Sequence, residues 1–384
     1  MLLIYPQFLH SWGNPPGNVA GILYGSNKQD ILTSMDKVRV SINGFGRIGR
    51  AFFRHALERE DLEVVAINDL ADLENLAYLL KYDTAYGHGP ADVRVERRDW
   101  KTVLVVNGRD IQFTQERDPA KLPWSEYSVD VVVEATGFFT EYGKASAHLE
   151  AGAKRVVISA PAKGEPVEGI VSGTVLMGIN DDILSTCQIT SNASCTTNAS
   201  SPLIQILHEH IGIEKAFLNT VHGYTSTQKL VDSPDGKDFR RGRAAAQNIV
   251  PSTTGAARAV TKVVTDLEGL FDGMAMRVPV ITGSAANIVF IAKRDTSVAE
   301  VNDTLKWAAG EERWQETFTV TEDPIVSSDI VGSKYAAIAD LGFTRVIGGN
   351  LVSVLSWYDN EMGYSHALAV HVAKLGKHAQ QEKK

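Results

Sequence analysis

The segment Gly44-Phe45-Gly46-Arg47-Ile48-Gly49 is the strongest indicator of the fold of this chain. It matches the pattern GxGxxG, which is weak evidence alone and gains its meaning from its setting. The motif follows residues 38–42 (VRVSI), a strand pattern, and opens a stretch with apolar residues at helical spacing. The missing side chains of such a strand-to-helix turn let a pyrophosphate approach the backbone, where the helix N-terminus stabilises it. The motif therefore predicts a dinucleotide site, and the alternative is a glycine turn made only for packing.

Asp69 supports the same prediction and bears on the choice of cofactor. It ends a second strand pattern, residues 62–67, about 20 residues after the last glycine, where a carboxylate accepts hydrogen bonds from the adenosine ribose. A 2′-phosphate about 4 Å from this carboxylate would be repelled by roughly 4 kcal/mol at an effective dielectric of 20. Solvent screening reduces the repulsion without changing its sign, so we expect NAD rather than NADP, with some NADP use left open.

The order of strand and helix patterns differs between the two halves of the chain. Up to about residue 160, strand patterns at 38–42, 62–67, 129–133 and 155–158 alternate with helical stretches, which predicts a doubly wound parallel sheet of the Rossmann type. A hairpin of residues 103–106 and 111–113 around Asn107-Gly108 interrupts this series. After Cys195, strand patterns at 274–280, 286–292 and 351–357 lack interposed helices, which predicts an α+β domain with a mostly antiparallel sheet.

Two helices of the second half are predicted from local signals. Ser297 and Glu300 form a capping-box pattern that leads into Val301, Leu305 and Trp307, so a helix should begin at Ser297 and cover the sheet of the second domain. Apolar spacing predicts a closing helix over residues 364–375.

Composition excludes several classes of protein. The 384 residues are too many for one core and predict two domains, while 44% hydrophobic and 22% charged residues are ordinary for globular proteins. A net charge of −8 provides no basic field for nucleic acid. Two cysteines, Cys187 and Cys195, cannot form a disulfide scaffold and fit a reducing, cytoplasmic compartment. No apolar run reaches the roughly 20 residues of a membrane span, and no Cys or His cluster has the spacing of metal ligands.

Residues 1–34 differ in character from the rest of the chain. They lack the basic and apolar regions of a secretory signal and the arginines of a transit peptide. The strand pattern begins just after Met35, so we expect residues 1–34 to be a disordered extension, or upstream sequence translated from a misassigned start codon.

Cys195 is the candidate nucleophile. It lies in residues 191–198 (SNASCTTN), a polar turn followed by apolar residues at helical spacing, so it should begin a helix, a position that stabilises a thiolate. The surrounding hydroxyls do not suit a core cysteine, whereas the apolar neighbours of Cys187 do. His222 ends a strand pattern, residues 217–221, and is the candidate partner that lowers the thiol pKa and transfers protons. The alternative is a structural histidine.

Anion-binding residues complete the pattern. Lys237, Arg240, Arg241 and Arg243 form a basic run, which is either a solvated loop or a phosphate site. Residues 252–255 (STTG) add hydroxyls and a bare backbone before a helical stretch, which also favours an anion.

Together these motifs resemble one family, the phosphorylating (type I) glyceraldehyde-3-phosphate dehydrogenases, from Met35 onward. The resemblance rests on residues 42–50 (INGFGRIGR), 191–198 (SNASCTTN), 221–225 (VHGYT), 240–246 (RRGRAAA), 253–257 (TTGAA), 273–279 (GMAMRVP) and 356–365 (SWYDNEMGYS).

The resemblance implies a glycolytic or Calvin-cycle enzyme, usually a homotetramer, that oxidises glyceraldehyde 3-phosphate with NAD and inorganic phosphate. In such an enzyme Cys195 attacks the aldehyde and His222 accepts the proton. Hydride transfer then leaves an acyl thioester, which phosphate cleaves to an acyl phosphate, 1,3-bisphosphoglycerate. The cofactor domain is implied to comprise residues 35–194 and 360–384, because the last helix returns to it, and the catalytic domain residues 195–359.

The resemblance also assigns site residues by motif position. The substrate phosphate is bound by Thr225, Thr227 and Arg277, and the inorganic phosphate by Ser194, Thr196, Arg241, Thr254 and Gly255. In the cofactor site, Asn360 is implied to orient the nicotinamide carboxamide and Tyr364 to border that pocket. Besides these and Asp69, the implied cofactor-binding residues are Gly44, Phe45, Gly46, Arg47, Ile48, Gly49, Arg117 and Thr136.

Departures from the family pattern leave alternatives. Ala199 replaces a second cysteine, so no redox relay with Cys195 is available there, and Ser233 before Pro234 replaces the leucine usual in NAD-preferring members. An erythrose-4-phosphate dehydrogenase is the nearest rival, although Thr225 and Thr254 favour the three-carbon substrate. A non-catalytic regulatory or binding protein on the same fold and an NADPH-consuming acyl-phosphate reductase are the others.

Overall fold

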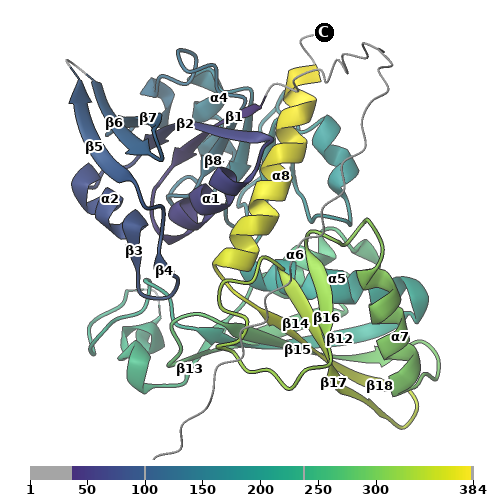
Figure 1. Cartoon of the computed structure of the whole chain (residues 1–384). Coiled ribbons are helices and arrows are strands. Elements are labelled where there is room, and N and C mark those ends of the chain that lie inside the picture. Colours follow the sequence, from purple (N-terminus) through teal and green to yellow (C-terminus); the bar gives the residue numbers. More distant parts are fainter. Residues whose placement is uncertain (1–36, 99–100, 237, 382–384) are drawn as a thin grey trace, which may run out of the picture. The chain divides into compact units, whose positions relative to one another are not determined.

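The computed structural model describes residues 37–98, 101–236 and 238–381. The predictions for residues 1–34 and for Lys237 lie outside these residues. The described chain folds around two large β-sheets, each with its own hydrophobic core (Figure 1).

The first sheet is mostly parallel, as predicted. Its strand order is β10-β11-β9-β8-β1-β2-β7-β6-β5, and every pair from β10 to β7 is parallel. The bounds are β1 (Val38–Asn43), β2 (Leu62–Asn68), β5 (Val93–Arg98), β6 (Lys101–Val106), β7 (Arg109–Thr114), β8 (Val131–Glu134), β9 (Arg155–Ile158), β10 (Ser172–Thr174) and β11 (Ile189–Ser191). Because β1 lies between β2 and β8, the winding direction reverses beside β1, which is where such sheets bind ligands.

The predicted hairpin is present at the edge of this sheet. Strands β6 and β7 pair antiparallel, and β5 pairs antiparallel with β6. Asn107 and Gly108 both have positive φ, 49° and 77°, as a two-residue hairpin turn with the correct twist requires. A small second hairpin is formed by β3 (Tyr82–Asp83) and β4 (Gly87–His88).

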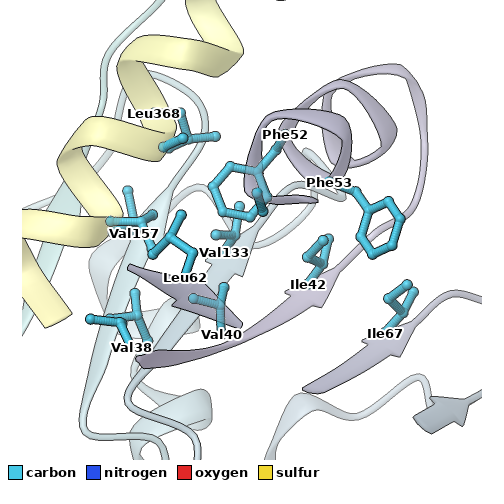
Figure 2. Close-up of a cluster of buried hydrophobic side chains, with 14 of the residues drawn as sticks. Val38, Val40, Ile42, Phe52, Phe53, Leu62, Ile67, Val133, Val157 and Leu368 are labelled. Carbon is cyan, nitrogen blue, oxygen red and sulfur yellow. The ribbon is translucent and has the colours of Figure 1, made fainter. Parts of the chain in front are cut away.

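The first sheet is covered by helices from the first half of the chain and by the last helix of the described residues. They are α1 (Arg47–Glu58), α2 (Leu73–Lys81), α3 (Tyr142–Ala145), α4 (Ala147–Glu150) and α8 (Met362–Gln381). The long α8 packs against α1, β1, β8 and β9 (Figure 1), so the predicted closing helix is confirmed and is longer than the spacing indicated. Figure 2 shows the resulting core, in which Leu368 of α8 and Phe52 of α1 meet the valines of β1, β8 and β9.

The second sheet is mostly antiparallel and is formed by the chain after Cys195. Its order is β13-β14-β12-β15-β18-β17-β16, with parallel pairs only at β12–β14 and β16–β17 among the described strands. The bounds are β12 (Ile213–Gly223), β13 (Val250–Thr253), β14 (Phe271–Val278), β15 (Ser284–Ala292), β16 (Phe318–Thr321), β17 (Ala337–Ile347) and β18 (Leu351–Tyr358). The helices α5 (Cys195–His210), α6 (Ala256–Thr261) and α7 (Val298–Ala309) pack on it. The predicted fold class is confirmed.

Helix α7 begins as the capping signal predicts, with one difference. Ser297 accepts a hydrogen bond from the Glu300 N–H (3.1 Å). The Glu300 carboxylate binds Arg294 and Thr296 instead of returning to the cap, so only half of the capping box forms. Val301 and Leu305 are buried, whereas Trp307 is 53% exposed and packs on His210.

Single turns of 3-10 helix complete the described elements, at Pro119–Lys121, Asp181–Ser185, Phe239–Gly242, Ala245–Gln247 and Thr265–Leu267. None of the helices in the described ranges combines the length and the apolar character needed to cross a bilayer.

Candidate active site

The three glycines of the fingerprint turn occupy three different environments. Gly44 has φ +97°, and a Cβ there would lie 2.7 Å from the Thr136 nitrogen. A Cβ on Gly49 would lie 2.1 Å from the Gly44 carbonyl oxygen, because α1 crosses the end of β1 closely. A Cβ on Gly46 would meet no atom within 4 Å. The open space at Gly46 precedes the unpaired N–H groups of the first turn of α1, which is where a pyrophosphate fits.

The side chains of Phe45 and Ile48 belong to the core. Phe45 is fully buried and packs edge-on against Phe53, and Ile48 packs against the same core. The Phe45 N–H donates to Asp69 Oδ2 at 2.7 Å. The side chains of these two residues therefore pack beneath the turn.

Asp69 is fixed at the carboxyl end of β2. Its Oδ2 accepts from the Phe45 N–H and its Oδ1 accepts from the Ala71 N–H (2.9 Å). A carboxylate accepts about four hydrogen bonds, so capacity remains for two ribose hydroxyls. Arg117 is exposed beyond β7, the neighbour of β2, on the same edge of the sheet.

Thr136 is held by a buried polar network that the sequence analysis did not identify. The Glu134 carboxylate, 1% exposed, accepts from Asn43 Nδ2 (2.6 Å), from the Thr136 N–H (2.9 Å) and from the Thr136 hydroxyl. His148 Nδ1 accepts from the Trp124 indole N–H (3.0 Å), which assigns the proton to Nε2, and Nε2 then donates to Glu134 (3.1 Å). Charge-assisted bonds thus fix the loop after β8 beside the fingerprint turn.

Cys195 and His222 are brought together as the sequence analysis expects. Cys195 is the first residue of α5, whose N-cap is Ser194. His222 lies near the end of β12, and its Nε2 is 3.3 Å from the Cys195 sulfur. His222 Nδ1 lies 2.7 Å from the Gly223 carbonyl oxygen, which assigns the proton to Nδ1. The lone pair of Nε2 therefore faces the thiol, as a general base requires.

The expectation of a lowered thiol pKa is not met. Burial raises the pKa of the Cys195 thiol and outweighs the opposing influence of the Arg277 charge and of the N–H groups of the first turn. Burial and the nearby Arg277 lower the pKa of His222 to about 4. The pair therefore rests as a thiol and a neutral imidazole, because the site is drier than a helix N-terminus in sequence suggests.

The turn before Cys195 is held in an unusual conformation. Ala193 is buried and has φ +54°, which a residue with a Cβ seldom adopts. Its N–H donates to Ser191 Oγ (3.1 Å), and its carbonyl accepts from the Tyr364 hydroxyl (3.1 Å). His371 binds the Asn192 side chain at 3.0 Å. Tyr364, expected at the nicotinamide pocket, thus also supports the nucleophile turn from α8.

Arg277 joins the catalytic pair to the proposed phosphate sites. Its Nη1 lies 3.2 Å from His222 Nδ1 and donates to the Gly223 carbonyl (3.3 Å). Burial lowers the pKa of Arg277, and the positive charge of Arg241 contributes in the same direction. The hydroxyls of Thr225 and Thr227 lie 3.0 Å apart in the turn after β12.

Other expected phosphate ligands have structural partners of their own. The Ser194 hydroxyl accepts from the Thr197 N–H (3.1 Å) as the cap of α5. The buried Thr196 hydroxyl is bonded to the Tyr358 hydroxyl at 2.9 Å. Thr254 Oγ1 accepts from the Ala256 N–H (3.2 Å), and Gly255 is the exposed N-cap residue of α6.

Asn360 is oriented by its side-chain oxygen. Oδ1 accepts from Ser284 Oγ (2.9 Å) and from the Gly283 N–H (3.2 Å). These bonds assign the amide nitrogen to the opposite side, where it can donate to a carboxamide oxygen.

Arg47 differs most from its expected place. Its side chain does not line the turn but binds Glu361 and Asp83. Other residues that sequence reasoning missed are Tyr358, which bonds both Thr196 and Thr220, and Phe138, which is 80% exposed just past β8. An aromatic residue two positions after Thr136 in a loop at the ligand edge was the available signal for Phe138.

Comparison with known proteins agrees with this geometry. Residues 38–142 match the model of the glyceraldehyde 3-phosphate dehydrogenase NAD binding domain, and residues 194–360 match the model of the C-terminal domain of the same enzyme. Glyceraldehyde-3-phosphate dehydrogenase from Geobacillus stearothermophilus is 48% identical over 344 residues, covering 88% of this chain and 99% of that protein. Glyceraldehyde-3-phosphate dehydrogenase from Mycobacterium avium is also 48% identical, with the same coverage, and glyceraldehyde-3-phosphate dehydrogenase 1 from Bacillus subtilis (strain 168) is 46% identical.

The likeness spans the fingerprint turn, the Cys195–His222 pair and the loop that carries Asn360, so the features built above from single residues lie within the matched ranges. This chain therefore belongs to the glyceraldehyde-3-phosphate dehydrogenase family.

Proposed function

We propose that this protein oxidises glyceraldehyde 3-phosphate to 1,3-bisphosphoglycerate with NAD and inorganic phosphate. The observation that carries the proposal is the Cys195 sulfur 3.3 Å from the unprotonated Nε2 of His222, at the start of α5 and beside Arg277. The family membership and the NAD binding domain match support the same activity and cofactor.

The chemistry begins with the thiol. As the sulfur forms a bond to the aldehyde carbon, its proton moves to His222 Nε2, and the carbonyl oxygen becomes the alkoxide of a hemithioacetal, from which hydride can leave while His222 keeps the proton for the thiolate released later. NAD supplies the acceptor for the hydride that this carbon then loses, which leaves an acyl thioester on Cys195. Oxygen of inorganic phosphate attacks the thioester carbon, and the carbon–sulfur bond breaks to release the acyl phosphate and the thiolate.

Arg277 gives substrate binding a direct effect on the base. Its positive charge is one reason why the pKa of His222 is as low as about 4. A substrate phosphate bound to Arg277 neutralises this charge and thereby raises the basicity of the imidazole when it is needed. Thr225 and Thr227 contribute hydroxyl donors to that phosphate. The inorganic phosphate binds to Arg241 and to the N-termini of α5 and α6.

The proposed cofactor contacts follow the edge of the first sheet. The backbone of residues 44–49 faces the pyrophosphate, Asp69 accepts from the adenosine ribose, and Asn360 donates to the carboxamide. Thr136, Arg117 and the exposed ring of Phe138 border the adenosine part. The open space over Gly46 and the orientation of the Asn360 amide support this placement.

The test is the initial rate of absorbance change at 340 nm with glyceraldehyde 3-phosphate, with and without inorganic phosphate, using NAD and NADP in turn. We expect phosphate-dependent reduction of NAD that is lost in Cys195→Ser. Cys187→Ser is the matched control, because Cys187 is a second free cysteine, buried in the first half of the chain, and should retain the rate. A preference for erythrose 4-phosphate, or NAD binding without turnover, would instead support one of the rival functions.

We infer that the chain assembles as a homotetramer in the cytoplasm. The outward side of the second sheet exposes Phe217 and Val221 of β12 and Leu351 of β18, whereas its other side packs on helices. The loop after β12 exposes Leu230 and Phe239 by more than four-fifths of their surface. Apolar areas of this kind are typical of subunit interfaces. Both cysteines are free, which suits a reducing compartment.

We also infer that residues 35–194 and 360–384 form the cofactor domain and residues 195–359 the catalytic domain. The contacts of α8 with α1, β1, β8 and β9 support the discontinuous boundary. Cys195 and Asn360 then lie at the two points where the chain passes between domains.

A further inference from the structure

Arg47 forms two ion pairs that join distant parts of the chain. It is the first residue of α1, directly after Gly46. Its guanidinium donates from Nε to both oxygens of Glu361 (2.9 and 3.1 Å), from Nη2 to Glu361 Oε2, and from Nη1 to Asp83 Oδ2 (2.5 Å). The carboxylates are largely buried, with side-chain exposures of 16% for Glu361 and 7% for Asp83, while Arg47 is 35% exposed, so the pairs are partly shielded from solvent.

A second set of bonds runs parallel to the first. The guanidinium lies over the Tyr86 ring, 5.5 Å from its centre, and the Tyr86 hydroxyl donates to Asp359 Oδ1 (2.8 Å). Asp359 is fully buried and also accepts from the Gly332 N–H (2.7 Å) and the Glu361 N–H (2.9 Å). We name Arg47, Asp83, Tyr86, Asp359 and Glu361 together the Arg47 clasp.

The clasp holds the two neighbours of Asn360. Asp359 and Glu361 flank this residue in the short connection between β18 and α8, and Asn360 itself is fixed to the second sheet by Ser284 and Gly283. The backbone of Arg47 lies in the first turn of α1, over which the pyrophosphate is proposed to bind. One residue thus contacts the proposed pyrophosphate site through its backbone and the segment of Asn360 through its side chain.

Two members of the clasp, Arg47 and Tyr86, keep their protonation states across the working pH. Burial opposes the charge of Arg47, but its bonds to Glu361 and Asp83 raise the pKa of the guanidinium above the ordinary value. Burial and the charge of Asp359 raise the pKa of Tyr86, so its hydroxyl stays a donor. Arg47 therefore stays charged and the Tyr86 hydroxyl stays protonated while they make these bonds.

We propose that the Arg47 clasp positions Asn360 relative to the pyrophosphate-binding turn, and so sets the placement of the nicotinamide without contributing to binding of the adenosine half. Arg47 is then a positioning residue in place of the cofactor ligand that the motif suggests. This inference rests on the proposed NAD site. It predicts that weakening the clasp separates the affinities for the two halves of the cofactor.

The test compares the dissociation constants of NAD and of ADP-ribose, which lacks the nicotinamide, by calorimetry. The main variants are Glu361→Gln and Tyr86→Phe, which leave the charge of Arg47 in place. Loss of one partly buried charged bond should weaken NAD roughly tenfold and lower kcat, while ADP-ribose changes less than twofold. The NAD affinity of Arg47→Lys should lie between those of the wild type and of Glu361→Gln, because one ammonium cannot hold both carboxylates in the same geometry.

The matched control is Arg59→Gln. Arg59 follows the other end of α1 and also binds two carboxylates, Asp61 (2.9 Å) and Glu316 (3.4 Å). This variant loses a comparable ion-pair set and should leave the ratio of the two dissociation constants at its wild-type value. Thermal melting of each variant reports any general loss of stability.

Several outcomes would overturn the inference. Equal weakening of NAD and ADP-ribose in Glu361→Gln, an unchanged NAD affinity, or the same selective loss in Arg59→Gln would each do so. Failure of the proposed function is seen separately, in the wild-type rate with glyceraldehyde 3-phosphate and phosphate. If the wild type binds NAD but is inactive, a selective loss of NAD affinity in the clasp variants would support the clasp inference alone. A wild type that binds no NAD would remove both proposals.

Discussion

At the scale of single residues, one fingerprint glycine is needed for the fold and another for the proposed binding of the cofactor. Gly49 is needed because α1 passes the Gly44 carbonyl at a distance that leaves no room for a Cβ. Gly46 has an ordinary φ of −72° and faces open space, so the protein itself places no demand on it. The same substitution at these two positions should therefore have opposite effects.

Gly46→Ala and Gly49→Ala test this separation. We expect Gly46→Ala to keep the free energy of unfolding within about 1 kcal/mol of the wild type, since its conformation suits alanine. It should weaken NAD at least roughly tenfold, because the methyl group occupies the space of the pyrophosphate. Gly49→Ala should destabilise the fold by about 1–3 kcal/mol through overpacking. Thermal melting and calorimetric titration with NAD measure both, and wild-type NAD affinity in Gly46→Ala would show that the turn binds no pyrophosphate.

The site pKa values are also set residue by residue. The helix N-terminus and Arg277 favour a thiolate at Cys195, yet burial is the larger influence and raises the thiol pKa. A local sequence signal indicates the direction of the helix field but not the depth at which the sulfur lies.

At the scale of helices and strands, α8 packs on the first sheet and contacts the turn before Cys195. Its buried side places Tyr364 against the Ala193 carbonyl and His371 against Asn192 and Thr190. Both contacts fix the segment that ends in Cys195. Burial lowers the pKa of His371 to about 3, so this histidine is neutral in the folded protein at any working pH.

His371 should therefore contribute to acid sensitivity. Between its unfolded pKa of about 6.5 and its folded pKa of about 3, the unfolded chain binds a proton that the folded chain does not. The free energy of unfolding consequently decreases as the pH falls through this window, by about 1.4 kcal/mol per pH unit from this group.

Urea unfolding at pH 7, 6 and 5 checks this prediction. The amide of His371→Gln still offers a donor and an acceptor. In this variant the free energy of unfolding should decrease less steeply as the pH falls, by about 1.4 kcal/mol per pH unit, which corresponds to one proton. The exposed His88→Gln is the control and should keep the wild-type slope. An unchanged slope in His371→Gln would mean that His371 is protonated in the folded state.

At the scale of the entire protein, the second sheet is covered unequally. Along β15 and β18 every second residue is buried toward the helices, and the alternate residues remain partly or fully exposed. The apolar side chains on that open side are the basis for expecting further copies of the chain.

Phe217→Glu tests the expected assembly. Placing a charge at the centre of an apolar interface should shift the particle mass in solution toward dimers or monomers, because the carboxylate would be buried without a partner. Trp307→Glu is the control, since Trp307 is exposed to a similar degree (53% against 47%) but lies on α7. Sedimentation velocity measures both. A tetramer that persists in Phe217→Glu would exclude this face as an interface.

Features that depend on neighbours along the chain could be predicted from the amino-acid sequence alone. The glycine turn, the Asn107-Gly108 hairpin, the cap at Ser297 and the start of α5 at Cys195 are each specified within a few residues, because backbone conformation and capping are local. The resemblance of the motifs then identified the family.

What distant residues do together depends on the packed fold. The bond between Cys195 and His222 joins positions 27 apart, and the pair of Arg47 and Glu361 joins positions 314 apart. The motif assigns Arg47 and Phe45 to the ligand, although packing turns one toward Glu361 and buries the other. The expectation of a lowered thiol pKa fails for the same reason, since burial and long-range charge arise from the packing of two sheets and their helices and leave no local pattern in the sequence.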